Sequence, residues 1–382
     1  MGNFGTGPVS RRGLIRLGGG AAAGLVLGGV GASAARAATT LTDGTALATA
    51  LPVSKAFDLS DGASALFMHE QAWCPTVMQC AGFDHINKHW YVSQVMYNPA
   101  DGVSYDTRKL EGDIAITKLS EDGSTKLGRM YLRGFGHGAQ IGIEATAAGA
   151  APYIWIEYDS EPNSKNAGFG TKLCRIKYAG APAGASPRSF HWDDAADRTA
   201  MNFKDRTPDP LKLPGAGTTL TSPRPVVDMQ HRRLLVRFNR NEQLQCAVWD
   251  LDTAVGAPLG APLHHFADLP TPKPAYDRQG FCLYGSYMYM LEGTEYTDGG
   301  PTDTTDVGTT YITRVDLNTG VYERFLTRAL KSLVHREPEG MNIMLVPAPA
   351  RPGSFLPRLT FGFASGVSGD RRVNIAYKDA LV

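Results

Sequence analysis

The stretches "RRLLVRFN" (Arg232–Asn239) and "CAVWDLDTAVG" (Cys246–Gly256) show the pattern that decides the fold. The first is a short run of aliphatic and aromatic residues, and the second is a similar run that ends in turn-forming residues. Short runs rich in Val, Ile, Tyr, Phe and Trp, bounded by Gly, Pro, Asp and Asn, are typical of β-strands. The two stretches therefore predict two successive strands.

This pair of runs occurs five times. Runs of the first type begin at residues 89, 152, 232, 287 and 358, and each is followed by a run of the second type, such as "KLCRIKYAG" or "YITRVDLNTG". Repeated strand units of this length indicate a β-propeller. We predict an all-β, single-domain, five-bladed β-propeller whose inner strands are the aromatic-rich runs. A β-sandwich or two small barrels are the alternatives, because the spacing is irregular.

Three further segments carry structural predictions. We expect "SALFMHEQAWC", Ser64–Cys74, to complete the last blade and close the ring. "VDLNTGVYERF" has Asn-Thr-Gly at its centre and predicts the outer hairpin of a blade. The candidate for a helix is "RFLTRALKSLV", Arg324–Val334.

The N-terminus has the features of an export signal. Arg11 and Arg12 precede an uncharged Gly/Ala/Leu stretch, and "ARA" ends at Ala37 with a small-x-small pattern. These features predict a twin-arginine signal peptide over 1–37, whereas the glycines argue against a membrane helix. We expect a flexible leader over 38–55, the propeller over 56–382, and secretion through the twin-arginine pathway.

Charge and composition exclude several classes of partner. The signal carries four arginines and no acid, so its removal changes the formal charge from +1 to −3. This balance gives no electrostatic reason to expect nucleic acid or, after signal cleavage, a membrane as partner. We expect a monomer.

The five cysteines divide into two groups. Cys74 and Cys80 are the closest pair, and either a disulfide or two thiols is compatible with the sequence. Cys174, Cys246 and Cys282 lie in apolar strand patterns, which predicts small core residues.

Four motifs in order resemble a known family. They are Gln71 in "HEQAWCPTVMQCAGFD", the strand Trp90 to Gln94, the Gly136 to Glu144 turn in "RGFGHGAQIGIE", and Glu337 to Gly340 in "HREPEGM". From about Leu66 onward, the chain resembles the phage receptor-binding and teichoic-acid-biosynthesis-protein-C-like β-propellers, a group that includes helveticin-type bacteriocins.

The resemblance implies a five-bladed propeller associated with cell-wall glycopolymers. Phage members of the family dock onto wall teichoic acid, and bacteriocin members act on neighbouring cells. This sequence has a twin-arginine pattern and no stem or trimerisation segment, so we do not expect it to assemble into a tail spike.

His137 stands between Gly136 and Gly138, and it is the most distinctive candidate. Flanking glycines allow positive φ and bring the imidazole close to a neighbouring blade. A histidine there can bond a sugar hydroxyl, bind phosphate when protonated, or act as a general base. Its alternative role is structural, as a tie between blades.

The candidate residues fall into two sets. For catalysis, a polysaccharide lyase or glycoside hydrolase would use His137 with Glu144 or Glu339. Glu337 and Glu339 share strand parity, so their side chains can point the same way, and paired carboxylates can support glycoside hydrolysis. We expect no metal and no cofactor, since His85 and His89 lie in turn-like sequence and nucleotide motifs are missing. The predicted ligand-binding residues are Gln71, Trp73, Gln94, His137, Gln140 and Arg237.

These observations lead to one main hypothesis and two alternatives. The main hypothesis is a secreted, non-enzymatic propeller that binds cell-wall or extracellular glycopolymer of the teichoic-acid type through one mouth of its channel. The first alternative is a polysaccharide lyase or glycoside hydrolase that uses the His/Glu pair. The second is a bacteriocin-like effector.

Overall fold

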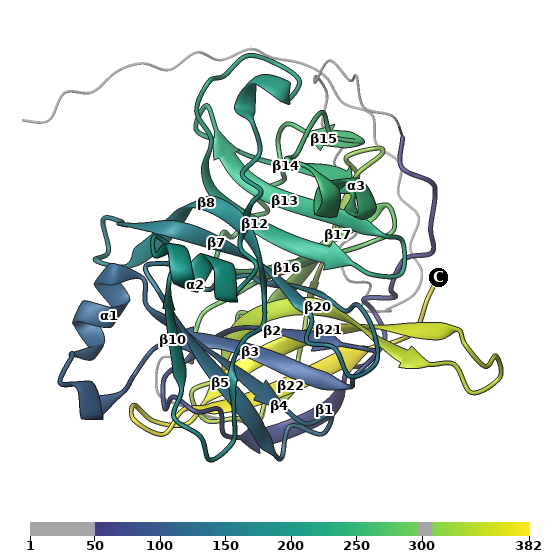
Figure 1. Cartoon of the computed structure of the whole chain (residues 1–382). Helices are drawn as coiled ribbons and strands as arrows, with labels where there is room; N and C mark the ends of the chain where they lie inside the picture. Colours follow the sequence, from purple (N-terminus) through teal and green to yellow (C-terminus); the bar gives the residue numbers. More distant parts are fainter. Residues whose placement is uncertain (1–49, 297–307) are drawn as a thin grey trace, which may run out of the picture. The chain divides into compact units, whose positions relative to one another are not determined.

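The computed structural model describes residues 50–296 and 308–382 (Figure 1). The predicted signal and the leader as far as residue 49 lie outside these ranges. The described strands form five antiparallel sheets, apart from one parallel edge strand, so the prediction of a five-bladed β-propeller is confirmed.

Each blade begins with its inner strand. The first blade contains β2 (Met78–Asp84), β3 (His89–Val95), β4 (Ile114–Leu119) and β5 (Lys126–Arg133), and the second contains β6 (Gly142–Glu144), β7 (Tyr153–Pro162), β8 (Gly168–Lys177) and β11 (Lys204–Asp205). The third contains β12 (Thr221–Asp228), β13 (Arg233–Arg240), β14 (Gln243–Asp250) and β15 (His264–Phe266). The fourth contains β16 (Arg278–Tyr284), β17 (Tyr287–Glu292), β18 (Tyr311–Asp316) and β19 (Tyr322–Leu326).

The fifth blade joins the two ends of the described chain. It contains β20 (Glu337–Pro347), β21 (Phe355–Ser365) and β22 (Arg372–Lys378), and β1 (Ser64–Glu70) supplies its outer strand. Ser64 of β1 lies opposite Tyr377 of β22 in an antiparallel ladder. The prediction that Ser64–Cys74 closes the ring is therefore confirmed for Ser64–Glu70, the part of this segment that forms β1.

Short elements decorate the blades. β9 (Ala181–Pro182) and β10 (Arg188–His191) extend the first sheet beside β5. Three short helices, α1 (Tyr105–Glu111), α2 (Ala195–Ala200) and α3 (Leu251–Gly256), lie in connections. No helix within the described ranges is long and apolar enough to span a bilayer.

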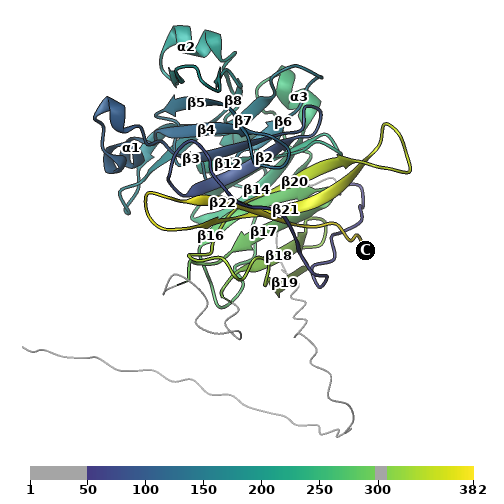
Figure 2. The same cartoon turned by 90° about the horizontal axis from the view of Figure 1, so that it is seen from below.

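The inner strands contact one another in the order β2, β6, β12, β16, β20 and back to β2. Figures 1 and 2 both show β2 beside β20, where the ring closes. The glycines of these strands permit the close approach. A Cβ on Gly340 would lie 2.6 Å from Cys80 Cα of β2, and a Cβ on Gly142 would lie 2.8 Å from Val227 Cγ2 of β12.

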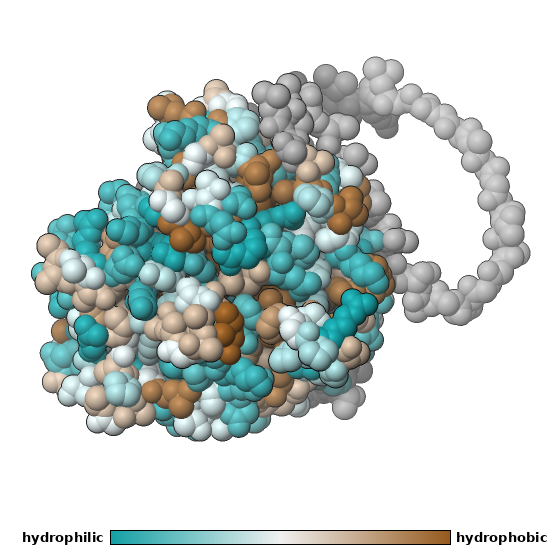
Figure 3. Space-filling view, turned by 45° about the vertical axis from the view of Figure 1, so that its right-hand side comes forward, coloured by the Kyte–Doolittle hydropathy of each residue, from teal (hydrophilic) through white to brown (hydrophobic). Residues whose placement is uncertain are grey.

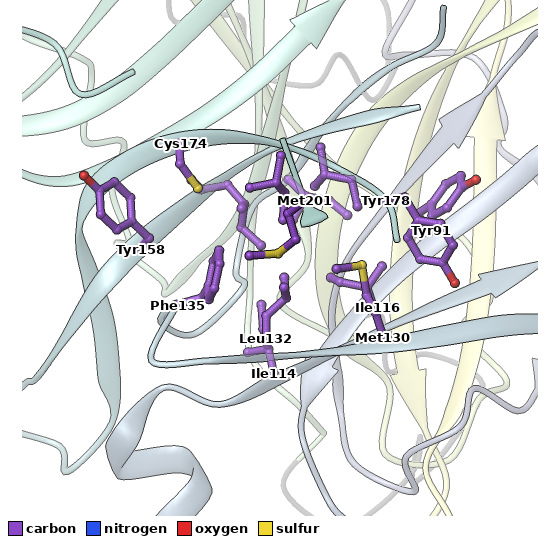
Figure 4. Close-up of a cluster of buried hydrophobic side chains, with 14 of the residues drawn as sticks. Tyr91, Ile114, Ile116, Met130, Leu132, Phe135, Tyr158, Cys174, Tyr178 and Met201 are labelled. Atoms are coloured by element: carbon purple, nitrogen blue, oxygen red, sulfur yellow. The ribbon is translucent and has the colours of Figure 1, made fainter. Parts of the chain in front are cut away.

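Five apolar clusters fill the spaces between blades, one for each neighbouring pair. The cluster between the first and second blades includes Ile114, Leu132, Phe135 and Cys174 (Figure 4). Side chains of one strand alternate between two clusters, as the period of a strand requires. In β7, for example, Ile154 and Ile156 face the first blade, whereas Trp155 faces the third.

This packing corrects the assignment of the inner strands. The aromatic-rich runs are β3, β7, β13, β17 and β21, which are the second strand of each blade. A second strand packs on both faces against neighbouring blades, so nearly every position is apolar. An inner strand instead faces the crowded axis and carries glycine and polar residues, which weakened its signal in the sequence.

The predicted helix at Arg324–Val334 is wrong. Tyr322–Leu326 forms β19, and the residues that follow form turns. Thr313 of β18 lies opposite Arg324, and the Arg324 guanidinium pairs with Glu292 of the neighbouring β17 at 2.9 Å. These tertiary contacts override the local helical pattern. The same pairing confirms the predicted hairpin around Asn318 to Gly320.

Two other predictions concern the edges and the core. Leu51, within the expected leader, is buried and exchanges hydrogen bonds with the Asn318 side chain at 2.7 and 2.9 Å, so packing against the propeller begins before residue 56. All five cysteines are buried free thiols. Cys174, Cys246 and Cys282 lie in the core clusters, as predicted.

Candidate functional site

All inner strands begin at one end of the ring, which we call the mouth. Polar and charged side chains gather there from four blades. They are His137 and Glu157 of the second blade, Arg224 and Arg237 of the third, Arg278 and Glu292 of the fourth, and Glu337 and Glu339 of the fifth. The mouth therefore carries two arginines on its third blade and two glutamates on its fifth.

The Gly-His-Gly turn wraps around a buried carboxylate. Glu157 of β7 is fully buried and accepts hydrogen bonds from the backbone N–H groups of Gly138 (2.8 Å) and Gly170 (2.6 Å). It also pairs with the Arg224 guanidinium. Burial raises the pKa of Glu157, and Arg224 and the N–H groups oppose that shift. Gly136 and Gly138 have φ of 131° and 71°, so the predicted positive φ is present on both sides of His137.

His137 lies in the loop before β6, not on an inner strand. Its ring lies 4.6 Å from the Phe169 ring, centroid to centroid, and its buried Nδ1 has no hydrogen-bond partner. Burial, followed by the charges of Arg224 and Lys109, lowers the pKa of His137 to about 4. The imidazole is therefore neutral near pH 7 and does not supply a positive charge.

Arg237 provides the cation that His137 does not. It lies directly across the ladder from Arg224, and its guanidinium stands 4.8 Å from the Phe281 ring centroid. Among the described residues it has no hydrogen-bond or ion-pair partner, and its Nε is buried. Burial and the charges of Arg224 and Arg278 lower the pKa of Arg237 to about 9. Arg237 is partly exposed, and an unpaired cation that is partly withdrawn from water favours an anion.

Two of the predicted ligand-binding glutamines have structural partners. Gln140 is fully buried at the axis, where its Oε1 accepts from Phe281 N (3.1 Å) and its Nε2 donates to Met341 O (3.2 Å). It thereby links β16 and β20 to the loop before β6. Gln94 is buried and donates to the backbone oxygens of Cys74 and Thr76, both at 2.6 Å. A ligand at either amide would have to replace these bonds.

Gln71 and Trp73 lie after β1, away from the axis. Gln71 is exposed and donates to Asp370 Oδ1 at 3.2 Å. Trp73 is partly buried, and the Arg129 guanidinium lies 4.2 Å from the centroid of its ring. Neither is brought together with His137 by any contact in the described part of the chain.

The Glu144 carboxylate is held by hydrogen bonds within the second blade. Its carboxylate accepts hydrogen bonds from Trp155 Nε1 (2.8 Å) and from Arg175 Nε and Nη2 (2.8 and 2.7 Å). It also lies opposite Tyr153 at the start of β7, so it stands at the other end of the ladder from Glu157 and His137. The structure thus does not assemble the His137 and Glu144 pair.

Glu337 and Glu339, by contrast, lie close together at the start of β20. Burial, followed by the charge of Glu337, raises the pKa of Glu339 well above its usual value. Burial also raises the pKa of Glu337, with contributions from Glu295 and Asp277. The nearby Arg371 opposes both shifts.

A cavity of about 420 Å³ opens between the fifth and first blades. Its walls include Thr76, Tyr97, Tyr105 and Arg371. The sequence reasoning missed these residues, and also Arg224 and Arg278. Tyr97 and Tyr105 stand in a turn-rich segment, and only the fold brings that segment against the 366–371 loop. No group of three or more His, Cys, Asp or Glu side chains in residues 50–296 and 308–382 has the arrangement of a metal site.

The fold defines a five-bladed β-propeller, and charged side chains gather at one end of its ring. No protein-family model and no curated protein matches this chain. Among solved structures, the tail fiber of Staphylococcus aureus phage P68 is similar over 85% of this chain, with 19% identity and a TM-score of 0.55. The chain covers 54% of that tail fiber, so the likeness concerns about half of it and shows the fold.

Two glycoside hydrolases are more distant neighbours. An exo-1,5-α-L-arabinanase from a bovine ruminal metagenomic library matches with 10% identity and a TM-score of 0.38, covering 81% of this chain and 95% of its own. An arabinoxylan arabinofuranohydrolase from Bacillus subtilis matches with 10% identity and a TM-score of 0.35, covering 82% and 65%.

Proposed function

We propose that this protein is a secreted propeller that binds an anionic glycopolymer, of the teichoic-acid type, at the mouth of the ring. The observation that carries the proposal is Arg237, a partly exposed arginine whose Nε is buried and which has no acidic partner among the described residues. An anionic group of the polymer would provide that partner and would relieve the repulsion between Arg237 and Arg224.

The surroundings of Arg237 suit a phosphate joined to sugars. Arg224 and Arg278 lie near enough to lower its pKa, and a guanidinium donates in a fork that matches phosphate oxygens. Phe169 is partly buried and carries His137 and Arg224 against its ring. A neutral His137 can exchange hydrogen bonds with a sugar hydroxyl. Binding of this kind requires no catalytic step.

The resemblance to phage receptor-binding and helveticin-type propellers supports the same partner, and the twin-arginine pattern supports secretion. We propose that the protein acts as a monomer on cell-wall or extracellular polymer. A surface with small, separate apolar groups, as on the face in Figure 3, is compatible with that state.

The test is binding of the purified chain to cell-wall sacculi, before and after teichoic acid is stripped. We expect binding to intact sacculi that is lost on stripping and lost in the Arg237→Met variant. Because phosphate contacts are screened, binding should also weaken as salt rises. His137→Ala should weaken binding less than Arg237→Met does.

Arg351→Gln is the matched control, because it also removes one positive charge but lies exposed in the turn between β20 and β21, away from the mouth. If Arg351→Gln loses as much binding to sacculi as Arg237→Met does, the loss is due to the change in net charge and not to the site. Unchanged binding by Arg237→Met would overturn the assignment of the site. Release of reducing or unsaturated ends from the polymer would show that the protein is a hydrolase or lyase and not a binding protein. Growth inhibition of related strains would favour the hypothesis of a bacteriocin-like effector.

A further inference from the structure

The cavity between the fifth and first blades lies at the same end of the ring as Arg237. Its walls come from the segment before β2, from the segments after β3 and β21, and from α1. β2 begins at the mouth, whereas β3 and β21 end there, because neighbouring strands of these blades are antiparallel. With a volume of about 420 Å³, the cavity falls in the range of small-molecule sites, about 300–1,000 Å³.

Two tyrosines form part of the cavity wall. Tyr97 and Tyr105 are 37% and 38% exposed, and neither phenol hydroxyl has a hydrogen-bond partner in the described part of the chain. The backbone fixes both positions, because Tyr97 N donates to Cys74 Sγ at 3.4 Å and Tyr105 directly follows Ser104, the N-cap of α1. A fixed aromatic ring with a free hydroxyl suits a sugar, since the ring packs on C–H groups and the phenol bonds hydroxyl groups.

Exposed apolar residues also lie in the chain segments around the cavity. Val367 directly precedes the lining residue Ser368, and a hydrogen bond of 3.1 Å from Gly366 N to Val334 O joins Val334 to the same loop. Both valines are exposed. Exposed apolar residues grouped around a cavity are typical of a binding site.

Arg371 supplies the charge of the cavity wall, and none of the described lining residues is acidic. Its contacts are made by Nη1, which lies 2.9 Å from Gly366 O and 3.4 Å from Glu295 Oε1. The same Glu295 oxygen lies closer, at 2.6 Å, to His335 Nδ1. Nε and Nη2 of Arg371 have no partner among the described residues. These two nitrogens can therefore donate parallel hydrogen bonds to a carboxylate or a phosphate.

The carboxyl groups of the fifth blade do not compete for this place. Glu337 and Glu339 are not among the described lining residues, and burial raises the pKa of both, which favours their uncharged forms. A cationic ligand would meet Arg371 and no carboxylate in the wall. An anionic ligand would instead complete the hydrogen bonding of Arg371.

We propose that this cavity binds a sugar unit that carries an acidic group, with its ring against Tyr97 and Tyr105 and its carboxylate or phosphate at Arg371. The inference deepens the proposed function and rests on it for the polymer, of which this sugar is one unit. Arg237 and the cavity then hold two anionic groups of one polymer chain at the same end of the ring.

The test uses small probes, so that it does not depend on the polymer. Binding of glucose, glucuronate, glucose 6-phosphate and glucosamine to the purified chain is measured by titration calorimetry or ligand-observed NMR. Every titration is repeated with Arg237→Met, so that binding at Arg237 is not counted. We expect glucuronate, glucose 6-phosphate or both to bind about tenfold more tightly than glucose, which corresponds to about 1.4 kcal/mol. A preference for glucuronate alone would identify a uronic acid, and one for glucose 6-phosphate alone would identify a sugar phosphate.

Two variants separate the charge from the aromatic contact. Arg371→Gln should remove the tenfold preference and leave the binding of glucose unchanged, whereas Tyr105→Ala should weaken the binding of all these sugars about fivefold. Tyr105→Phe should keep the ring contact and most of the affinity. Arg351→Gln, which removes an exposed arginine at the other end of the ring, is the control for the lost charge. Tyr105 is exposed, so its variants keep the test valid if Arg371→Gln does not fold.

The proposal is overturned if glucose binds Arg237→Met as tightly as both acidic sugars do, if glucosamine binds most tightly, or if no sugar binds. It is also overturned if Arg371→Gln keeps the acidic preference, or if Tyr105→Ala binds as the unmutated protein does. Each of these results leaves the binding of sacculi through Arg237 untouched, so the proposed function would stand. Conversely, binding of an acidic sugar in the cavity without binding to sacculi would retain the cavity site and remove the polymer.

Discussion

The two ends of the ring differ in how completely their charged side chains are bonded. At the end where the inner strands finish, each of three buried carboxylates is bonded. Asp84 accepts from Ile86 N and Asn87 N, Asp228 accepts from Gly285 N at 2.8 Å, and Glu144 accepts from Arg175 and Trp155. At the mouth Glu157 is bonded in the same way, whereas the side chains of Arg237, His137 and Glu339 have no partners among the described residues.

The difference teaches that buried charge has two uses in this fold. Asp84 and Asp228 occupy the same place in the first and third blades, where each carboxylate caps the turn between the first two strands. Those charges fix the hairpins. At the mouth, Arg237 and Glu339 lack such bonds, which lowers stability and leaves them available to a ligand.

The largest expected effect is at Glu144. Glu144→Ala leaves Arg175 buried without its partner and removes the acceptor of Trp155 Nε1, so the free energy of unfolding should fall by about 4 kcal/mol. Urea denaturation measures it, with the exposed Glu161→Ala as control. A loss below about 1 kcal/mol would contradict the contrast between the two ends.

Asp228→Ala should destabilise by about 3 kcal/mol, because the backbone N–H groups of Gln230, His231 and Gly285 lose their acceptor. Asp228→Asn should retain part of this stability, since its amide oxygen can still accept. Thermal unfolding of the two variants compares them. Equal losses would show that charge, not turn geometry, is the important property.

The pH dependence of stability tests His137. Its pKa is lowered from 6.5 to about 4, so the unfolded chain binds a proton below pH 6.5 that the folded chain refuses until about pH 4. The stability is present above pH 6.5 and is lost as the pH falls through that window. Between pH 7 and pH 5 the wild type should therefore lose about 2 kcal/mol more than His137→Gln. Parallel pH profiles of the two proteins would contradict a buried neutral imidazole.

Arg237→Met should have the smallest effect on stability. Replacing an unpaired, partly buried cation by an apolar side chain should leave the free energy of unfolding unchanged or raise it by about 1 kcal/mol. Chemical denaturation measures the change, in the same preparation that is used for sacculus binding. A loss of 3 kcal/mol or more would mean that Arg237 is structural and that the mouth resembles the other end.

Several features were predictable from the sequence because they depend on local pattern. The five pairs of runs predicted five blades, since alternation and turn residues are read within a few positions. The closing strand at Ser64 and the glycine-flanked turn at His137 were predicted for the same reason. The twin-arginine signal, the leader and the ligand set remain predictions.

Other features were decided by the tertiary structure, because they depend on which blades become neighbours. The second strand of each blade carries the stronger apolar signal, so the sequence placed the wrong strand at the axis. In the sequence, Glu144 and Gln140 are both polar residues near a turn. In the structure, Glu144 pairs with Arg175, whereas Gln140 forms hydrogen bonds with the backbone of the fourth and fifth blades. The sequence alone determined the number of blades, whereas long-range pairing in the ring decided which charges are satisfied and which remain open to a ligand.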